Sequence, residues 1–467
     1  MCGIVGICYK DFQAAQGVYT GLMNLQHRGK ETAGIAAYDN GRIRVKKGKG
    51  EVAQIFHDPS SLSDLTGNVA IGQTRYTTTG GSYDARNAQP IANTFRGEEF
   101  YLGHNGNIIN INEHGSNGLT GVSDTFLVGE MISRSKAQDF QSAIIEALQQ
   151  LKGSFNFIFL YRGKIYVAMD RFGFHPMSIG KKRDGFVVAS ETCAIDQIGA
   201  EYVADISPGE LIVISEGEME KYRWTEENNS LKLDIFEFIY FSRPDSCIHG
   251  VEVGQARYYM GQKLAMQFPI EADLVIPVPD SANEAALGYY DAIKTVYKNI
   301  EFRPWALFRS HYIGRTFIEP IANNRELVGQ QKFNPRRSQL QGKRVIVVDD
   351  SIVRSNTARM IARTLRNLGV KEIYFLAASP KYFNPDVYGV DTYRKGESLA
   401  MREYGGDEKR LACAINCDMI GYLNLDLTIG SVLQAQDEVG TKIFSPNTFY
   451  TGPFTGEYPD GTGPYEV

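Results

Sequence analysis

The 467-residue chain has few cysteines, no long apolar run and no block of basic residues, and each absence excludes a class of protein. Its six cysteines are spread along the chain, unlike the dense disulfide framework of a small secreted domain. No segment approaches the ~18 apolar residues of a membrane span, and the N-terminal residues lack the regions of a secretory signal. We therefore expect a cytoplasmic protein without a membrane partner.

The charge balance and the missing motifs narrow the class of ligand. With 49 Lys and Arg against 54 Asp and Glu, the formal net charge of −5 indicates no basic surface for nucleic acid. Neither a Walker A motif nor a G-x-G-x-x-G motif occurs. Hydrophobic residues make up 43% of the chain, as in ordinary globular proteins, and the length predicts two or three domains at roughly 150 residues each.

The two halves of the chain differ in pattern. The first half has short β-type runs separated by glycine, with helical periodicity between them, which predicts α+β sheets covered by helices. These runs cover residues 4–7, 34–38, 69–72, 100–102, 155–161, 164–169, 185–189 and 210–215. The second half has near-continuous apolar runs at residues 272–278, 344–348 and 372–378, which predicts an α/β domain with a parallel sheet.

Composition also suggests where the domains end. A polar stretch at residues 225–230 predicts a boundary, and the chain becomes rich in Gly, Pro and Tyr from about residue 437. The predicted organisation is a first domain at 2–228, a second at 229–436 and a tail at 437–467. We expect the tail to be loosely ordered because its composition offers little to a core.

Cys2 directly follows the initiator methionine, so removal of Met1 leaves a cysteine that carries the chain's α-amino group. An α-amine has an unperturbed pKa of about 8 and a thiol about 8.5, so near neutrality the amine can act as the base for its own thiol. By itself, such a cysteine is more often only a small residue at a chain start.

The segments that accompany Cys2 suit a small zwitterionic amide. They are QHRGKE at 26–31, GQTRYTTTG at 72–80, NAQP at 87–90, GHNGN at 103–107 and SDT at 123–125. A guanidinium such as Arg75 holds a carboxylate, and a carboxylate such as Asp124 holds an ammonium. The Asn105 side chain and the Gly106 N–H can stabilise a tetrahedral oxyanion, although an isolated Asn-Gly pair is usually a turn.

Taken together, these segments resemble the class II glutamine amidotransferase domain, an αββα sandwich of the N-terminal-nucleophile hydrolases, over residues 2–225. The resemblance implies that Cys2 attacks the glutamine amide and that Asn105 and Gly106 form the oxyanion hole. It further implies that the glutamine-binding residues are Arg28, Arg75, Tyr76 and Asp124, with Arg28 and Tyr76 ordering the loop around glutamine.

A second set of polar residues follows the apolar run 344–348. Asp349, Asp350 and Ser351 come directly after it, and a helical pattern begins beyond residues 354–357 and stops at Gly369. Carboxylates at the end of a buried parallel strand face a ligand, and the following helix N-terminus favours a phosphate. With Mg²⁺ the two carboxylates can bridge to a diphosphate, although the turn alone could simply cap a helix.

Three further segments, at residues 236–246, 278–281 and 311–320, complete a pattern that resembles type I phosphoribosyltransferases. The two halves in this order resemble the amidophosphoribosyltransferase family over about residues 2–435. The resemblance implies that ammonia released from glutamine at Cys2 passes through a channel to C1 of phosphoribosyl pyrophosphate, displacing pyrophosphate, in the first step of purine synthesis. It also implies a homotetramer and inhibition by purine nucleotides.

The resemblance assigns the second site residue by residue. Mg²⁺, held with the substrate by Ser281, Asp349 and Asp350, is the implied cofactor. The implied contacts to phosphoribosyl pyrophosphate are Ser281, Arg315, Lys332, Asp349, Asp350, Ser351, Arg354, Ser355, Asn356 and Thr357. Lys332 matches a loop that closes over the substrate, and Arg315 is a candidate phosphate contact.

The second half departs from the family pattern at two glycines. Ser355-Asn356 stands where relatives usually have Gly-Thr, and Ala282-Asn283 follows the segment 278–281 where Gly is usual. An amidotransferase that acts on a modified phosphoribosyl or nucleotide acceptor, and a nucleotide-binding homologue without turnover, therefore stay open. Retention of Cys2 and of the two carboxylates argues against the second alternative.

Some members of the family hold an iron–sulfur cluster with four cysteines, and the expected positions are not cysteine here. Asp234 occupies one such region and Asp386 another, while Cys413 and Cys417 lack companions at metal-ligand spacing. We expect no iron–sulfur cluster.

Overall fold

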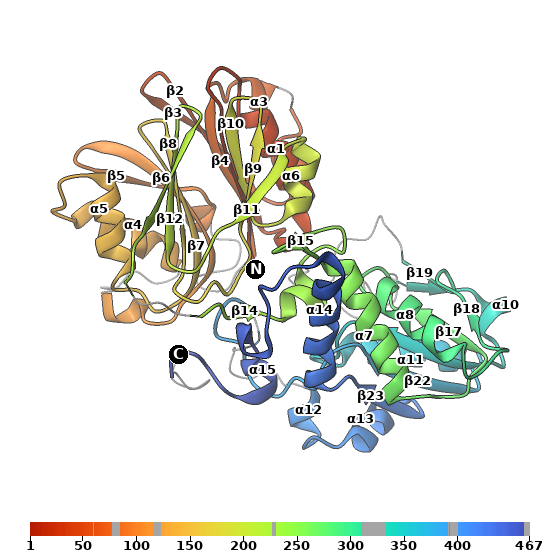
Figure 1. Cartoon of the computed structure of the whole chain (residues 1–467). Coiled ribbons are helices and arrows are strands. Elements are labelled where there is room, and N and C mark those ends of the chain that lie inside the picture. The colour runs from red at the N-terminus through yellow and green to blue at the C-terminus, as the bar shows by residue number, and fades with distance from the viewer. Residues whose placement is uncertain are drawn as a thin grey trace.

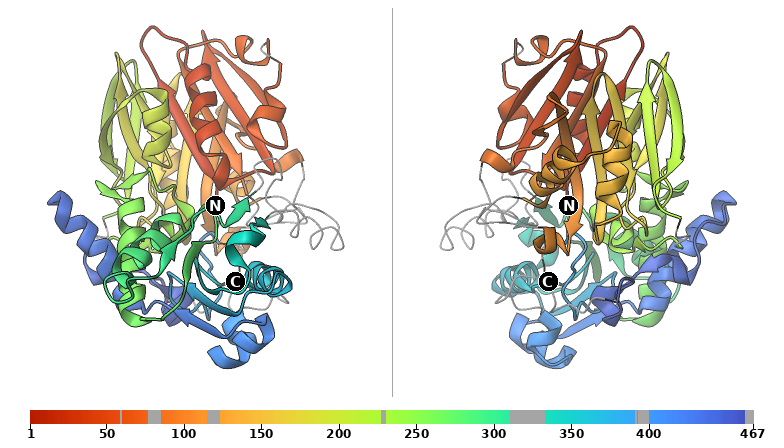
Figure 2. Two further views of the ribbon diagram at one scale, coloured as in Figure 1. Left: turned by 90° about the vertical axis from the view of Figure 1, so that its right-hand side faces the viewer. Right: turned by 90° about the vertical axis from the view of Figure 1, so that its left-hand side faces the viewer.

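The computed structural model describes residues 1–58, 60–76, 85–114, 123–226, 230–309, 333–390, 392 and 400–461. It contains two units, the first built on two antiparallel sheets and the second on a parallel sheet. The N-terminus lies between the two units (Figure 1), and the same arrangement is seen from two other sides in Figure 2. Among the described residues, none of the helices combines the length and apolar character that crossing a bilayer requires.

The first unit is a sandwich of a seven-stranded and a six-stranded sheet. In spatial order the larger sheet comprises β11 (Glu201–Asp205), β9 (Ser178–Lys182), β10 (Gly185–Ala189), β1 (Gly3–Cys8), β4 (Val69–Arg75), β2 (Thr32–Asp39) and β3 (Arg42–Lys49). The smaller sheet comprises β13 (Glu218–Arg223), β12 (Glu210–Ser215), β8 (Lys164–Met169), β7 (Gly153–Tyr161), β6 (Glu98–Ile108) and β5 (Ile91–Phe95).

Helices cover the outer face of each sheet, which gives four layers (Figure 1). The larger sheet carries α1 (Ala15–Asn24), α2 (Val52–Ile55) and α6 (Thr192–Ile198), and the smaller sheet carries α4 (Asp124–Arg134) and α5 (Phe140–Leu148). Short elements complete the unit: η1 (Gln26–Arg28), α3 (Ser60–Ser63), η2 (Ala85–Asn87) and η3 (Ile111–His114). This confirms the predicted αββα sandwich.

The central strand β7 shows why the layers stack in this way. Its phenylalanines Phe155, Phe157 and Phe159 pack among the side chains of α4 and α5, whereas Ile158 and Leu160 pack between the two sheets. Because successive side chains of a strand point to opposite faces, apolar residues that occupy both faces of a strand need a cover on each face. The run at 155–161 therefore requires both a helical layer and a second sheet.

The second unit has a five-stranded sheet in which every neighbouring pair is parallel. Its spatial order is β18 (Glu301–Phe302), β17 (Leu274–Pro277), β21 (Arg344–Asp349), β22 (Glu372–Ala377) and β23 (Met419–Tyr422). On the central strand β21, Val345 and Val347 face one core and Ile346 and Val348 face the other. The apolar runs predicted to be buried on both faces are therefore confirmed as strands of a parallel sheet.

Helices lie on both faces of this sheet. One face carries α7 (Val253–Gln267), α8 (Asn283–Ile293) and α14 (Leu425–Val439), and the other carries α11 (Asn356–Asn367) and α13 (Glu408–Ile415). The remaining elements are β14 (Leu233–Asp234), the π-helix η4 (Glu237–Phe241), β15 (Cys247–Ile248), β16 (Val251–Glu252), β19 (Leu307–Arg309), β20 (Phe333–Pro335), α10 (Arg337–Leu340), α12 (Ala400–Glu403), η6 (Pro446–Thr448), β24 (Phe449–Tyr450) and α15 (Gly452–Thr455).

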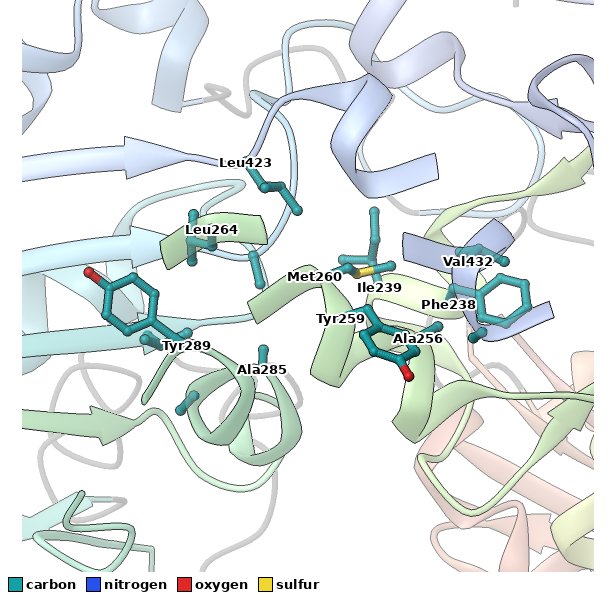
Figure 3. Close-up of a cluster of buried hydrophobic side chains, with 14 of the residues drawn as sticks. Phe238, Ile239, Ala256, Tyr259, Met260, Leu264, Ala285, Tyr289, Leu423 and Val432 are labelled. Carbon is teal, nitrogen blue, oxygen red and sulfur yellow. The ribbon is translucent and has the colours of Figure 1, made fainter. Parts of the chain in front are cut away.

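The helices α7 and α8 touch backbone to backbone beside the core shown in Figure 3, where Met260 and Ala285 are labelled. A Cβ at Gly261 would lie 1.9 Å from the carbonyl oxygen of Ala285, and a Cβ at Gly288 would lie 1.9 Å from that of Tyr258. Only glycine permits this approach. The contact fixes α8, whose N-terminus follows the loop that contains Ser281.

The tail differs from the expected loose segment. Helix α14 continues to Val439, and β24 pairs in parallel with β14, so the chain returns to the boundary between the units. Tyr450 is 1% exposed and Tyr458 is 9% exposed because both pack with Tyr388. The expectation was wrong for residues 437–461. A count of Gly and Pro suggests a loose segment, but the tyrosine and phenylalanine side chains at these positions supply apolar surface that packs against the rest of the protein.

We expect the Gly261→Ala substitution to lower the free energy of unfolding by about 1–3 kcal/mol, because the added methyl group forces α7 and α8 apart. Denaturant unfolding of the purified protein measures this change. The matched control is Gly430→Ala on α14, where the nearest atom to the new Cβ is the flexible Lys263 Nζ at 3.3 Å. The control should be neutral or stabilising by up to about 1 kcal/mol, and equal losses in both variants would contradict the close-approach argument.

Candidate active site

Cys2 lies at the start of β1, in the middle of the larger sheet of the first unit. Because β1 pairs with β4 so that Gly3 opposes Thr74, the end of β4 lies beside Cys2. The Cys2 Sγ atom is 3.6 Å from the carbonyl oxygen of Tyr76. Arg75, the last residue of β4, is buried, and its guanidinium lies 3.9 Å from the carboxylate of Glu31. The sheet register therefore brings Cys2, Arg75 and Tyr76 together.

Asn105 faces Cys2 from β6 of the other sheet. The backbone N–H of Cys2 donates to Asn105 Oδ1 at 2.7 Å, and the fully buried Nδ2 of Asn105 has no hydrogen-bond partner among the described residues. A buried amide donor without a partner is costly in a folded protein, unless a ligand accepts from it. This donor, adjacent to the nucleophile, is what an oxyanion hole requires.

Gly106 adopts a backbone conformation that other residues rarely adopt. Its φ is +147°, and a Cβ there would lie 2.1 Å from the carbonyl oxygen of Ser154 on the neighbouring strand β7. The glycine is therefore required by both sterics and backbone conformation. The Asn-Gly pair that could have been a hairpin turn lies inside strand β6 instead.

Asp124 begins α4 and is an ionised carboxylate at neutral pH. Burial alone would raise its pKa, but the charge and hydrogen bond of His104, 3.5 Å away, and the N–H groups of Ile108 and Thr125 lower it to about 2. A buried anion with these partners can hold the ammonium group of an amino acid. The sequence analysis missed His104, although it is adjacent to Asn105 in the motif GHNGN.

Arg28 differs from its expected contact with glutamine. Its guanidinium is completely buried and donates to the Cys2 carbonyl at 3.1 Å, to Glu191 at 2.6 Å and to both carboxylate oxygens of Glu237, at 2.7 and 3.1 Å. Four N–H···O contacts leave little of this side chain for a substrate. We therefore assign Arg28 to the support behind Cys2, and its predicted role in ordering the loop around glutamine stays a prediction.

The loop after β21 of the second unit lies beside the loop after β17, because the two strands are neighbours in the parallel sheet. Asp349 ends β21, and Asp350 is 7% exposed. The hydroxyl group of Ser281 donates to one carboxylate oxygen of Asp350, and the hydroxyl group of Ser351 donates to the other at 2.7 Å. The predicted ribose and metal residues Ser281, Asp349, Asp350 and Ser351 therefore converge at the carboxyl edge of the sheet.

The two glycine departures have different structural consequences. Ser355 precedes α11 with φ 59° and ψ −7°, in the left-handed region that favours glycine. Ala282, before α8, has φ −103°, which any residue adopts. Ser355 thus keeps the backbone conformation of a glycine at some cost, whereas Ala282 adds no backbone strain. Asn356 and Thr357 form the first turn of α11, directly after Arg354 and Ser355.

Two predicted contacts, Arg315 and Lys332, lie outside the described residues. Within the described residues, no group of three or more His, Cys, Asp or Glu side chains converges as metal ligands. Mg²⁺ in phosphate sites typically uses one or two carboxylates, water and the substrate's own phosphates. Asp349 and Asp350 fit that pattern, since both stand at the sheet edge next to a helix N-terminus.

Asp234 and Asp386, at the positions where relatives with an iron–sulfur cluster are expected to have cysteine, are buried carboxyls close to the tail. Burial raises the pKa of both groups, and the charge of Asp386 raises that of Asp234 further. Cys417 is buried, which raises its pKa to about 12, and Cys413 is exposed. The absence of an iron–sulfur cluster stays a prediction.

Comparisons with known proteins agree with both units. A family model described as a glutamine amidotransferase domain matches residues 78–197. The amidophosphoribosyltransferase of Synechococcus elongatus is 36% identical over 470 residues, which cover 98% of this chain and 91% of that protein. That of Methanocaldococcus jannaschii is 36% identical over 449 residues, covering 91% of this chain and 93% of that protein.

Solved structures give the same result. The glutamine phosphoribosylpyrophosphate amidotransferase from B. subtilis, complexed with ADP and GMP, has a TM-score of 0.86 at 35% identity and covers 98% of this chain and 97% of that chain. A structure described as the allosteric regulatory enzyme of purine biosynthesis has a TM-score of 0.87 at 35% identity, with coverage of 98% and 96%.

An N-terminal-nucleophile sandwich joined to a parallel sheet with two carboxylates at its carboxyl edge defines the class: a glutamine amidotransferase fused to a type I phosphoribosyltransferase domain. The identities over nearly the whole chain define the family within that class. The chain belongs to the amidophosphoribosyltransferase family and is an enzyme of that family.

We expect Ser355→Gly to stabilise the protein by up to about 1 kcal/mol, because glycine adopts the left-handed conformation without the cost that Ser bears there. Thermal unfolding measures this change. Ala282→Gly serves as the control, since its φ is already ordinary, and it should destabilise slightly or have no effect. A loss of stability in Ser355→Gly would show that the Ser355 side chain contributes more than its conformation costs.

We expect Asp234→Asn to stabilise the protein at pH 8, by an amount that shrinks as the pH falls toward 4. The raised pKa means that the folded state retains a proton that the unfolded chain releases above its ordinary pKa of 3.8, so wild-type stability falls as pH rises through the folded pKa. One pKa unit corresponds to about 1.4 kcal/mol, and we expect a gain of that order. The amide oxygen of Asn still accepts the Phe236 N–H.

Denaturant unfolding at pH 5, 6.5 and 8 tests the effect of this Asp234 substitution. The exposed residue Asp437 provides the control, because Asp437→Asn should change stability by less than about 0.5 kcal/mol at every pH. A pH-independent effect of Asp234→Asn would mean that this carboxyl retains no proton in the folded state.

Proposed function

We propose that the enzyme transfers the amide nitrogen of glutamine, as ammonia, to C1 of phosphoribosyl pyrophosphate, giving 5-phosphoribosylamine, glutamate and pyrophosphate. Two observations carry this proposal. Asn105, whose Nδ2 donor has no partner among the described residues, lies beside Cys2 in one unit, and Ser281 contacts Asp350 in the other. The reaction is the first step of purine synthesis.

In the glutaminase unit, removal of Met1 turns the Cys2 nitrogen into an amine that can take the thiol proton. The thiolate attacks the amide carbon of glutamine, and Asn105 Nδ2 with the Gly106 N–H donates to the oxyanion. Ammonia leaves and a thioester forms on Cys2, which water then hydrolyses to glutamate. Arg75 and Asp124 hold the carboxylate and ammonium groups of the substrate at its other end.

In the second unit, Asp349 and Asp350 bind the ribose hydroxyls, and the loop 354–357 with the N-terminus of α11 holds a phosphate. Mg²⁺ held near Asp349, Asp350 and Ser281 would neutralise the diphosphate leaving group. The proposal also includes Lys332, predicted to lie in a loop that closes over the substrate, and Arg315, a predicted phosphate contact. In the loop 354–357, Ser355 adopts a backbone conformation that favours glycine. This supports phosphoribosyl pyrophosphate as the acceptor over a modified phosphoribosyl compound.

The N-terminus lies at the contact between the units, which supports transfer through a protected channel. Met1 is 3% exposed, and its amino group lies 3.4 Å from the carbonyl oxygen of Gly389 in the second unit. Exclusion of water keeps ammonia in its nucleophilic, unprotonated form. Regulation by purine nucleotides, a homotetramer and a cytoplasmic location complete the proposal. The relative solved with ADP and GMP supports the regulatory part.

We expect Cys2→Ala to abolish release of glutamate from glutamine while release of pyrophosphate with free ammonia stays within about twofold, because only the first step needs the thiol. Both products are measured with purified enzyme, Mg²⁺ and phosphoribosyl pyrophosphate. Intact mass should show the wild-type protein without Met1.

Cys413→Ala is the control, since this exposed cysteine lies far along the chain in α13, and it should keep both activities. Loss of both activities in a folded Cys2→Ala protein would overturn the two-site mechanism. An active enzyme that retains Met1 would overturn the role of the Cys2 amine.

A further inference from the structure

Glu237 belongs to the second unit, yet its carboxylate supports the nucleophile of the first. It begins the π-helix η4, just after the boundary between the units, and is fully buried. Both of its oxygens accept from Arg28, and Arg28 Nε donates to the carbonyl oxygen of Cys2. One carboxylate and one guanidinium thus connect the second unit to the nucleophile.

The charge state of this cluster suits a fixed support. Burial alone would raise the pKa of Glu237, but Arg28 and His175 lower it to about 2, so the carboxylate is ionised at neutral pH. Burial alone would lower the pKa of Arg28, but Glu237 and Glu191 hold it above its ordinary value. A bidentate, fully buried pair of this kind has one orientation, because the carboxylate matches the planar guanidinium.

The support matters most once Met1 is gone. A residue at a chain terminus has a peptide bond on one side only and is poorly ordered unless other contacts hold it. The Cys2 backbone nitrogen donates to Asn105, and the Cys2 carbonyl oxygen accepts from Arg28. The Arg28 contact therefore fixes the peptide plane from which the thiol and the amine project.

Glu237 also connects toward the acceptor site. The hydroxyl group of Ser242 donates to Glu237 at 2.7 Å, and the carbonyl oxygen of Ser242 accepts from the buried Arg257 at 2.7 Å. Arg257 in turn interacts electrostatically with Asp350, the carboxylate that Ser281 and Ser351 contact. Hydrogen-bonded, buried polar groups therefore extend from Cys2 as far as Arg257.

We propose that Glu237 is a positioning residue for the glutaminase reaction: it orients Arg28, and through Arg28 the nucleophile Cys2, so that the glutaminase site is complete only with the second unit docked. This inference rests on the proposed function and extends it to a residue of the acceptor unit. Glu237 touches neither substrate.

The test compares Glu237→Gln with wild-type enzyme. The variant keeps the shape of the side chain but faces Arg28 with an amide N–H, so Arg28 should tilt toward Glu191. We expect kcat for glutamate release to fall about 10- to 100-fold, since misplacing a reacting group by about 1 Å costs this much. The KM for glutamine should stay within about threefold because Arg75 and Asp124 are unchanged.

Two further measurements separate positioning from a general structural role. Pyrophosphate release with free ammonia should remain within about twofold of wild type, which reports an intact second unit. In the Arg28→Lys background, Glu237→Gln should cause little additional loss, because the two residues act as one unit. Glu51→Gln, which removes the partly exposed Lys30–Glu51 ion pair of the first unit, is the control and should leave all rates unchanged.

The outcomes are distinct. A raised KM with unchanged kcat, additive losses with Arg28→Lys, or equal losses of the glutamine and ammonia reactions would each overturn the positioning role. If Glu237→Gln does not fold, Glu237→Asp, which keeps the charge and withdraws it by one methylene group, is measured in the same way and must show the same selective loss of kcat. Wild-type enzyme without glutamine-dependent pyrophosphate release would instead overturn the proposed function, independently of Glu237.

Discussion

The arrangement of the two units depends on a buried guanidinium held between two carboxylates. Arg28 of the first unit donates to Glu237 of the second, and Glu191 of the first unit accepts from the Arg243 N–H and the Ser246 hydroxyl of the second. Removing one partner from a buried ion pair typically costs about 3–5 kcal/mol, because it leaves an uncompensated charge. Each unit therefore supplies buried hydrogen-bond donors to a carboxylate of the other. These contacts fix the relative position of the units and hold the nucleophile where they meet.

Around this charged cluster, the contact is aromatic. Tyr388 stacks on Phe174 with ring centroids 4.1 Å apart, and its carbonyl oxygen faces His175 Nε2 at 2.8 Å. The tail residues Tyr450 and Tyr458 cover the same group. Aromatic stacking and tyrosine burial exclude water from the space beside the ion cluster, which strengthens the electrostatic interactions within it. The C-terminal segment is thus part of the contact between the units.

The second site follows from strand order. Ser281 and Asp350 are 69 positions apart in the chain, yet β17 and β21 are neighbouring parallel strands, so the loops that leave them meet at one edge. The glycine contact between α7 and α8 sets how closely α8 approaches the core and therefore where Ser281 lies. Ser355, before α11, adopts the left-handed backbone conformation that favours glycine, the residue that the family resemblance predicts at this position.

Elements whose signal is local can be identified from the amino-acid sequence alone. Apolar runs such as 155–161 and 344–348 identify buried strands, because side-chain burial follows the period of the strand. The motif around Cys2 and the carboxylates at 349 and 350 identify the two reacting centres, because their chemistry depends on residue type. The edge strands β3 and β13 have no such apolar run and were not predicted. They contain many charged residues, so their hydrophobicity differs little from that of the neighbouring turns.

The distant residues that support the nucleophile become apparent only in the folded chain. No spacing in the sequence connects Glu237 to Arg28, which are 209 positions apart, and His104 is recognisable only once Asp124 lies beside it. The tail likewise appeared loose because its tyrosines gain their burial from Tyr388, on another segment. Burial, and with it the strength of a charge or hydrogen bond, is a property of what the folded chain places around a group, and the local sequence does not contain it.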